Sequence, residues 1–373
     1  MKSYIYILFI ICILQVLSAC IYTNSGKHKD SSAFTDSIDS VLEDSVCTPL
    51  KKDCVTIAMV GDIMLGTTYP DTLLPPQEGR LLFRDVKTIL QNADLAAGNL
   101  EGTLSDTAST TKKESAHSYA FRTPTRYVER LKEVGFDFLG MANNHIFDFG
   151  LSGVLSTEQS LRESGIAFAG LKGRSSCSVV ERNGVRFGVC AFGHNGYTLQ
   201  HNDLSAVKNV LDKLRSCVDI VVVCFHGGGE GKGFSHLPYE KEVFLNEDRG
   251  SLREFAHFCI DNGADVVYGH GPHVVRCIEL YNNRFIAYSL GNFCTPYGIS
   301  LAGISGFAPV IEAKVKRDGS FVSGKIHSFI QKRGLGPRRD STNSVVNQIR
   351  LLTRSDIPNG KLSINSDGEI VVK

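Results

Sequence analysis

Polar side chains of the kinds that bind metals or transfer protons follow an apolar run near the middle of the sequence. Residues 136–140 predict a short buried strand, and Asn143, Asn144, His145 and Asp148 come directly after it. Two amides, an imidazole and a carboxylate are costly to bury without partners, but at the end of a strand they can face a cleft. The cluster therefore predicts a chemical site at this strand end.

The same arrangement recurs five more times along the chain. Apolar, strand-like runs at 55–62, 95–101, 220–226, 265–273 and 285–292 each end in ligand-type residues. Sites in open α/β sheets form at the carboxyl ends of strands. Six such strand ends predict a single convergent site.

The residue types at these strand ends indicate metal chemistry. Carboxylate, amide and imidazole groups together suit divalent Mn, Fe or Zn. We expect the metal ligands to be Asp62, Glu101, Asn144, His226, His270 and His273. Two ions would activate water and hold the oxygens of a phosphoester, while His145 protonates the leaving group. No Cys-x-x-Cys pair is present, which argues against a cysteine zinc site.

Residues next to these ligands have alternative explanations. Asp148 either caps the following helix or orients His145. Glu230, in a glycine-rich loop, is a ligand, a base or a solvated side chain, and Asn292 is a site amide or a turn residue. Asn143 is expected to bond to the backbone. The remaining histidines carry no spacing signal and are expected at the surface or in a satisfied core: His117, His194, His201, His236, His257 and His327.

The order of predicted elements changes halfway along the chain. Strands and helices alternate as far as about residue 169, which favours a layered α/β sheet. After that, hairpins are predicted at Asn183-Gly184, Asn282-Asn283, Asp318-Gly319 and Asp367-Gly368. The fold class expected is α/β, with two packed mixed sheets and helices outside.

The N-terminus predicts the compartment. Residues 1–19 have a short basic start followed by an apolar run, which is typical of a signal peptide. Leu17-Ser18-Ala19-Cys20 is similar to the lipobox of bacterial lipoproteins, which implies lipidation of Cys20. Residues 20–53 are polar and predict a flexible tether. We expect the tether to be followed by a domain at 54–330 and by a C-terminal extension at 331–373 that packs on this domain.

Composition and charge argue against one class of binding partner. The formal net charge of this 373-residue chain is +1, and no dense basic stripe is present, so nucleic acid is not expected as a partner. Nine cysteines follow Cys20. Cys190 and Cys224 lie inside apolar runs and are expected to be buried, whereas Cys47 and Cys54 bracket the entry to the first strand and could pair.

Six ordered motifs between about residues 55 and 311 resemble the CapA-type capsule synthesis (poly-gamma-glutamate biosynthesis) family. They are Gly-Asp-x-Met-Leu-Gly at 61–66, Asn-Leu-Glu at 99–101, Ala-Asn-Asn-His-x-x-Asp-x-Gly at 142–150, His-Gly-Gly-x-Glu at 226–230, Gly-Ala-Asp-Val-Val-Tyr-Gly-His-Gly-Pro-His-Val at 263–274 and Tyr-Ser-Leu-Gly-Asn-Phe at 288–293. That family is similar to calcineurin-like metallophosphoesterases. The resemblance implies an αββα sandwich, Asn99 among the site residues and an acid role for His145.

The resemblance also implies a biological setting and contains one departure. Together with the lipobox-like sequence at Cys20, it implies a lipid-anchored bacterial envelope protein, in the periplasm or on the cell surface, working with other capsule synthesis proteins on an anionic polymer or phosphoester. Phosphoesterases of that superfamily usually carry Asp-x-His where this chain has Asp62-Ile63-Met64. Two functions stay open: a metal-dependent hydrolase or transferase, and a non-catalytic polymer-binding, export or tethering factor.

Overall fold

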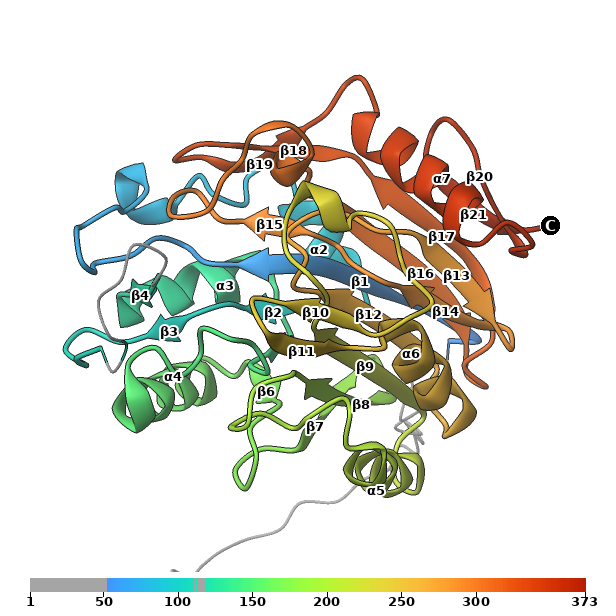
Figure 1. Cartoon of the computed structure of the whole chain (residues 1–373), viewed down its shortest axis with the longest axis horizontal. Helices are drawn as coiled ribbons and strands as arrows, with labels where there is room; N and C mark the ends of the chain where they lie inside the picture. Colours follow the sequence, from blue (N-terminus) through green and yellow to red (C-terminus); the bar gives the residue numbers. More distant parts are fainter. Residues whose placement is uncertain (1–51, 111, 113–118) are drawn as a thin grey trace, which may run out of the picture. The chain divides into compact units, whose positions relative to one another are not determined.

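The computed structural model describes residues 52–110, 112 and 119–373 (Figure 1). The predicted signal peptide, the predicted lipidation site Cys20 and nearly all of the predicted tether lie outside the described residues, as do Cys47 and His117. Cys54 is a free thiol at the start of the first strand.

Nine strands form the larger sheet. Eight follow the order β20-β21-β17-β16-β1-β2-β5-β6, and β15 pairs with β1. The strands are β1 (Cys54–Ile63), β2 (Leu95–Leu100), β5 (Phe138–Gly140), β6 (Ala167–Ala169), β15 (Asn292–Cys294), β16 (Val310–Lys316), β17 (Phe321–His327), β20 (Leu362–Ile364) and β21 (Glu369–Val372). Strands β15, β1, β2, β5 and β6 run parallel, and the others pair antiparallel.

Six strands form the smaller sheet, in the order β13-β14-β12-β9-β8-β7. They are β7 (Cys177–Arg182), β8 (Val185–Phe192), β9 (Ile220–His226), β12 (Val266–His270), β13 (Ile278–Tyr281) and β14 (Arg284–Ala287). The central four strands are parallel and both edges are antiparallel hairpins. The expected pair of mixed sheets is therefore confirmed.

Helices and short strand pairs complete the described chain. The helices are α2 (Lys87–Asn92), α3 (Val128–Val134), α4 (Gly150–Glu163), α5 (Leu204–Arg215), α6 (Leu252–Asp261) and α7 (Ser344–Asp356), with 3-10 turns η1 (Pro76–Gly79), η2 (Thr125–Tyr127), η3 (Lys232–Phe234) and η4 (Gly303–Gly306). The strand pairs are β3 (Thr103–Leu104) with β4 (Arg122–Thr123), β10 (Glu242–Phe244) with β11 (Glu247–Gly250), and β18 (Phe329–Lys332) with β19 (Gly336–Arg339).

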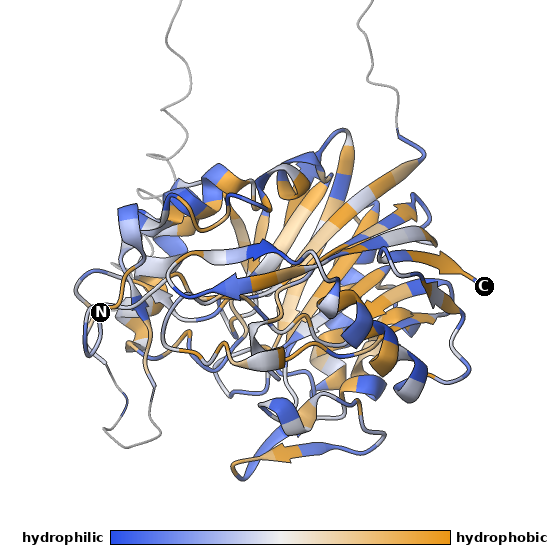
Figure 2. Cartoon of the chain, turned by 90° about the horizontal axis from the view of Figure 1, so that it is seen from above, coloured by the Kyte–Doolittle hydropathy of each residue, from blue (hydrophilic) through white to orange (hydrophobic). Residues whose placement is uncertain are grey.

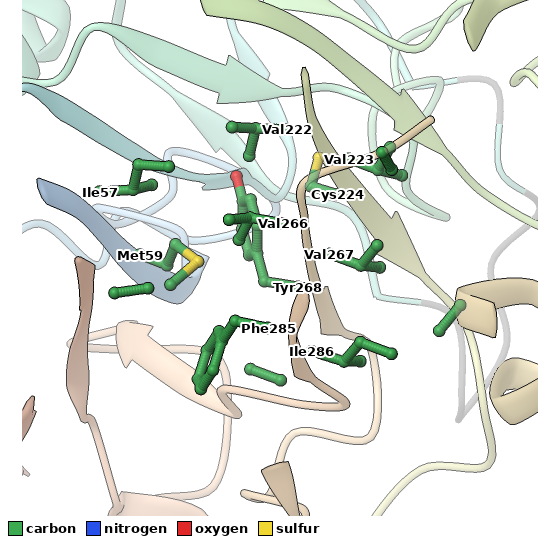
Figure 3. Close-up of a cluster of buried hydrophobic side chains, with 14 of the residues drawn as sticks. Ile57, Met59, Val222, Val223, Cys224, Val266, Val267, Tyr268, Phe285 and Ile286 are labelled. Atoms are coloured by element: carbon green, nitrogen blue, oxygen red, sulfur yellow. The ribbon is translucent and has the colours of Figure 1, made fainter. Parts of the chain in front are cut away.

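Alternation along β1 explains why this strand is buried on both faces. Ile57 and Met59 point into the layer between the two sheets, where they pack in one core with residues of β9, β12 and β14 (Figure 3). Ala58 and Val60, one residue out of phase, pack against side chains of α2, α3 and α4. The strand therefore lies in the middle of a helix–sheet–sheet–helix sandwich.

Helix α5 shows how local sequence forms the outer layer. Asp203 accepts a hydrogen bond from the Ala206 N–H at 3.0 Å and so caps the helix. Val207, Leu211 and Leu214 recur at helical spacing and are buried, while polar residues face outward. Figure 2 shows the same division, with hydrophobic strands inside and hydrophilic residues on outer helices and loops.

Most predicted elements agree with the structure. All four predicted hairpins are present. Helix α2 begins only at Lys87, because residues 80–86 form turns. The β10–β11 hairpin was not predicted, since Leu245 and Asn246 at its turn both adopt positive φ without a glycine.

Candidate metal centre

The carboxyl ends of two groups of parallel strands meet at one edge of the sandwich. In the larger sheet, Asp62 on β1 stands opposite Asn99 on β2 and Asn292 on β15. In the smaller sheet, His226 on β9 stands opposite His270 on β12. Strand register thus brings these predicted strand ends into two facing rows.

A bulge in β1 helps to aim Asp62. The pairing between β1 and β2 slips between Met59 and Asp62, which is typical of a β-bulge beside a site. Gly61 lies so close to the backbone of Gly291 that a Cβ on it would come within 1.9 Å of the Gly291 carbonyl oxygen. Only glycine fits there, so the motif's first residue has a steric explanation.

Two overlapping sets of potential metal ligands share Asp62. One set is Asp62, His226 and His270, and the other is Asp62, Glu101 and His273. Within each set, one ligand atom from each residue lies within 4.8 Å of the others. Five of the six predicted ligands are therefore gathered, and imidazole and carboxylate together suit Mn, Fe or Zn.

Asp62 is held by polar contacts on both oxygens. Asn99 donates a hydrogen bond from Nδ2 to Oδ1 at 2.8 Å, and Nδ1 of His273 lies 3.1 Å from Oδ2. Burial would raise the pKa of Asp62, but the hydrogen bond and charge of His273 outweigh it and lower the pKa. Asp62 therefore stays ionised, as a metal ligand must.

Glu101 is the least satisfied group in the site. Its two carboxylate oxygens are buried and neither has a hydrogen-bond partner, although Nε2 of His273 lies 3.7 Å from Oε1. Burial, and then the charge of Asp62, raise its pKa well above the ordinary value. A buried carboxylate without donors is costly, so this position fits a cation.

The histidines of the two sets differ in charge. Burial would lower the pKa of His273, but Glu101 and Asp62 raise it to about 10, so this ring acts as a cation beside both carboxylates. Burial, and then the charge of His270, lower the pKa of His226, whereas burial lowers the pKa of His270 to about 4. These two rings are neutral and can offer lone pairs to a metal.

Amide side chains tie the strand ends together. Asn143 donates to the Asn99 Oδ1 at 3.0 Å and to the Leu100 carbonyl at 2.8 Å, and its own oxygen accepts from the His145 N–H at 3.2 Å. It fixes the turn, as expected. Asn144 Oδ1 is buried without a hydrogen bond. Asn292 Oδ1 lies 2.9 Å from Nδ1 of His273, so Asn292 is a site amide.

His145 lies beside a carboxylate and a lysine. Its Nδ1 is 2.9 Å from Oδ2 of Asp148, which also accepts from the Phe121 N–H at 3.0 Å. Lys112 Nζ lies 2.5 Å from Oδ1 of Asp148 and 3.3 Å from Nδ1 of His145. Asp148 therefore orients His145 rather than capping helix α4.

Glu230 is paired rather than solvated. Arg249 Nη1 donates to its Oε1 at 2.8 Å, and the Arg249 guanidinium is almost fully buried. The glycine-rich loop carrying Glu230 is anchored further by Glu242, which accepts from the Gly229 N–H at 3.0 Å and pairs with buried Arg276. The charge of Glu230 contributes to raising the pKa of Glu101 and the pKa of His273.

His194, whose position in the sequence carries no spacing signal, lies next to the candidate metal ligands. It lies just beyond β8, its ring centroid is 6.2 Å from that of His226, and its Nε2 is 3.4 Å from Oε2 of Glu247. Burial, and then Arg249, lower its pKa to about 4. The signal that could have found it is an apolar run followed by Gly193-His194, the pattern seen at the other strand ends.

The sequence matches one family model and several individual proteins from bacteria. The family model described as bacterial capsule synthesis protein PGA_cap matches residues 56–297. PGA biosynthesis protein CapA of Bacillus subtilis is 29% identical over 261 residues, covering 66% of this chain and 64% of that protein. Capsule biosynthesis protein CapA of Bacillus anthracis is 26% identical over 339 residues, covering 86% and 77%.

Solved structures with low sequence identity also align with the chain. A hypothetical protein from Thermus thermophilus has a TM-score of 0.46 at 15% identity and covers 74% of this chain and 99% of its own. The calcineurin-like phosphoesterase YfkN from Bacillus subtilis has a TM-score of 0.40 at 14% identity and covers 82% and 98%. The family match spans well over half of the sequence, and the chain belongs to the PGA_cap family of bacterial capsule synthesis proteins.

Proposed function

We propose that this chain is a lipid-anchored envelope protein whose strand-end site binds divalent metal and carries out hydrolysis or transfer on an envelope polymer or phosphoester. Relatives named for capsule biosynthesis support the setting. The lipid anchor rests on Cys20 and the preceding Leu-Ser-Ala. Among the described residues, no helix is long and apolar enough to cross a membrane.

The observation that carries the metal proposal is the state of Glu101. Its two buried oxygens have no hydrogen-bond donor, although they lie beside Asp62 and Oε1 is 3.7 Å from Nε2 of His273. Nε2 of His226 and of His270 and Oδ1 of Asn144 are likewise buried without partners. Lone pairs from carboxylate, imidazole and amide converge, which is a donor set that Mn, Fe or Zn accepts.

Burial indicates the side from which substrate arrives. His226 and His270 are at most 1% exposed, whereas the side chains of His145 and His273 are 12% and 15% exposed. Bound metal would supply a water activated for attack on phosphorus or a carbonyl carbon. His145 would then donate its proton to the leaving group, with Asp148 holding Nδ1 so that the other ring nitrogen faces the substrate.

Metal content of the purified full-length protein tests the first half of the proposal. We expect near-stoichiometric Mn, Fe or Zn in the parent after reconstitution, and loss of the metal in a doubly substituted Asp62→Ala, His273→Ala protein. His257→Ala is the matched control, because that ring pairs with Glu279 outside the site. A parent that stays empty after reconstitution would refute the metal centre.

Turnover tests the role of His145. We expect metal-dependent hydrolysis of bis(p-nitrophenyl) phosphate to fall about 10²- to 10⁴-fold in His145→Ala, the usual contribution of general acid catalysis. Metal content should not change, because His145 belongs to neither ligand set. Unchanged turnover in His145→Ala would rule out the acid role.

The alternative, a non-catalytic polymer-binding, export or tethering factor, is favoured by one observation. Met64 is 1% exposed and its methyl group packs toward Gly298, so it brings no nitrogen ligand to the position two residues after Asp62. This alternative predicts that an anionic polymer still binds after chelation and in His145→Ala. Binding that is lost under either condition would exclude it.

A further inference from the structure

Two cysteines face each other across the hairpin at one edge of the smaller sheet. Cys177 opens β7 and stands directly opposite Cys190 of β8 in the strand register. Both thiols are free in the structure, and Cys190 is fully buried while Cys177 is half-buried. Directly opposite residues of an antiparallel pair project from the same face of the sheet, so the two side chains are neighbours.

The hairpin turn determines what kind of pair the two cysteines form. Asn183 and Gly184 at the turn have φ angles of 53° and 71°, as a two-residue type I′ turn requires. The residues that flank such a turn are a hydrogen-bonded pair, and the two kinds of pair alternate from there. Cys177 and Cys190 come five positions further along the register and are therefore a non-hydrogen-bonded pair. Cα atoms in such a pair are about 4.5 Å apart, within the range of about 4.4–6.8 Å that a disulfide spans.

Helices cover one of these cysteines more closely than the other. A Cβ on Gly188, two residues before Cys190 on β8, would lie 2.9 Å from the Leu214 side chain of α5, so this face of β8 lies beneath the helix. Val179, two residues after Cys177 on the same face, is 51% exposed. Burial also raises the pKa of the Cys190 thiol well above its ordinary value. A reagent from solvent therefore reacts first at Cys177.

The strand ends that carry these cysteines lead into two loops beside the metal centre. Residues 170–175 precede β7, and residues 193–199 follow β8. The Lys172 N–H donates to the Tyr197 carbonyl at 3.0 Å, which joins the loops, and the Tyr197 hydroxyl donates to the Asn144 carbonyl at 3.1 Å. A covalent bond between β7 and β8 at this end would hold both loops at their bases.

We propose that Cys177 and Cys190 are the site of a cross-strand disulfide that locks these two loops, formed by exchange with a disulfide donor of the cell envelope. The inference goes beyond the proposed function and depends on neither metal nor turnover. It takes from that function only the envelope location, where disulfides form and persist.

The exchange has two steps and is balanced. The Cys177 thiolate attacks one sulfur of the donor disulfide, which forms a mixed disulfide and releases the first donor thiol. The Cys190 thiol then gives up its proton as its sulfur attacks Cys177, and the second donor thiol leaves with a proton. The two cysteines lose two electrons in total, and the donor disulfide gains them as it becomes two thiols.

Peptide mapping of the full-length protein tests the bond directly. The protein is reduced, freed of reductant and treated with oxidised glutathione, after which free thiols are blocked with iodoacetamide and trypsin is added without reductant. Trypsin cuts after Arg182 and Arg186, which leaves the two cysteines on separate peptides, 175–182 and 187–208. We expect mass spectrometry to find these peptides joined. We also expect a melting temperature about 5 °C above that of the reduced protein, the usual gain for a closed loop of this length.

Three variants separate the steps. Cys177→Ser should lose both the joined peptides and the rise in melting temperature. Cys54→Ser is the matched control, because Cys54 is also a half-buried thiol at the start of a strand and should leave both results unchanged. In Cys190→Ala the second step has no nucleophile, so Cys177 should remain joined to glutathione.

Three results would contradict the proposal. Both peptides carrying the iodoacetamide label after donor treatment would overturn the disulfide. Cys190 joined to Cys259 of α6 would overturn the choice of partner. Joined peptides without any rise in melting temperature would overturn the locking of the loops.

Discussion

The buried ion pair between Arg276 and Glu242 provides a quantitative test of how the site loop is held. Arg276 is fully buried, and its two Nη atoms donate to the Glu242 carboxylate at 2.8 and 2.6 Å, while Nε donates to the Phe234 carbonyl at 2.8 Å. The same carboxylate accepts from the Gly229 N–H. Glu242 therefore joins β10 to the loop that carries Glu230.

Glu242→Ala should destabilise the protein by about 3–5 kcal/mol, the cost of leaving one partner of a buried pair uncompensated. Replacing both residues, as Glu242→Leu with Arg276→Met, removes both charges. Only the Gly229 N–H and the Phe234 carbonyl then lose partners, at about 1 kcal/mol each. The double variant should therefore cost about 2 kcal/mol and be more stable than the single variant.

Urea denaturation followed by far-UV circular dichroism measures these differences, since the chain has no tryptophan to report by fluorescence. Glu240→Ala is the control, because Glu240 is exposed on the same segment. The reasoning would be refuted if Glu242→Ala cost no more than Glu240→Ala. It would also be refuted if the loss of unfolding free energy in the double variant equalled the sum of the losses in Glu242→Leu alone and Arg276→Met alone.

Three further predictions concern stability and reactivity. Gly140→Ala should cost about 1–3 kcal/mol in urea, because its Cβ would lie 2.7 Å from a sulfur of the opposing sheet, whereas Gly196→Ala, with open space around it, should cost much less. Burial would raise the pKa of Asp94, but hydrogen bonds from Lys52 and from the Thr56 N–H outweigh burial and lower the pKa. Its stabilisation is therefore present above the unfolded pKa near 3.9 and lost as pH falls through the folded pKa, so Asp94→Asn should show a shallower loss of melting temperature in acid. Among the cysteines that the structure describes, Cys217 is exposed and should react fastest with Ellman's reagent, and equal rates at the buried cysteines would contradict the described core.

Much of the candidate site could be predicted from local sequence. An apolar run followed by Asp, Asn, Glu or His indicates a strand end, and parallel strands present their carboxyl ends together. Asp62, Glu101 and His273 could be grouped on that basis alone. The structure adds that they are within reach of one metal, and that Glu101 has no donor on either oxygen.

Residues on antiparallel hairpins and loops could not be placed in this way. Arg249 lies on a hairpin whose turn has no glycine signal, and it reaches the site because its backbone pairs with the loop after β9. His194 looked isolated in sequence because only one ligand-type residue follows its strand. Both positions depend on contacts between segments far apart in the chain, which no local periodicity reports.

By itself, the sequence determined the α/β class, the two mixed sheets, the hairpin turns and the strand ends that carry chemistry, because each follows from periodicity and turn residues over short stretches. Only the tertiary structure decided which ends face one another, since sheet order and register set distances between residues such as Asp62 and His273, separated by 211 positions. It also decided protonation, because burial and neighbouring charge, rather than residue type, make His273 cationic and His226 neutral.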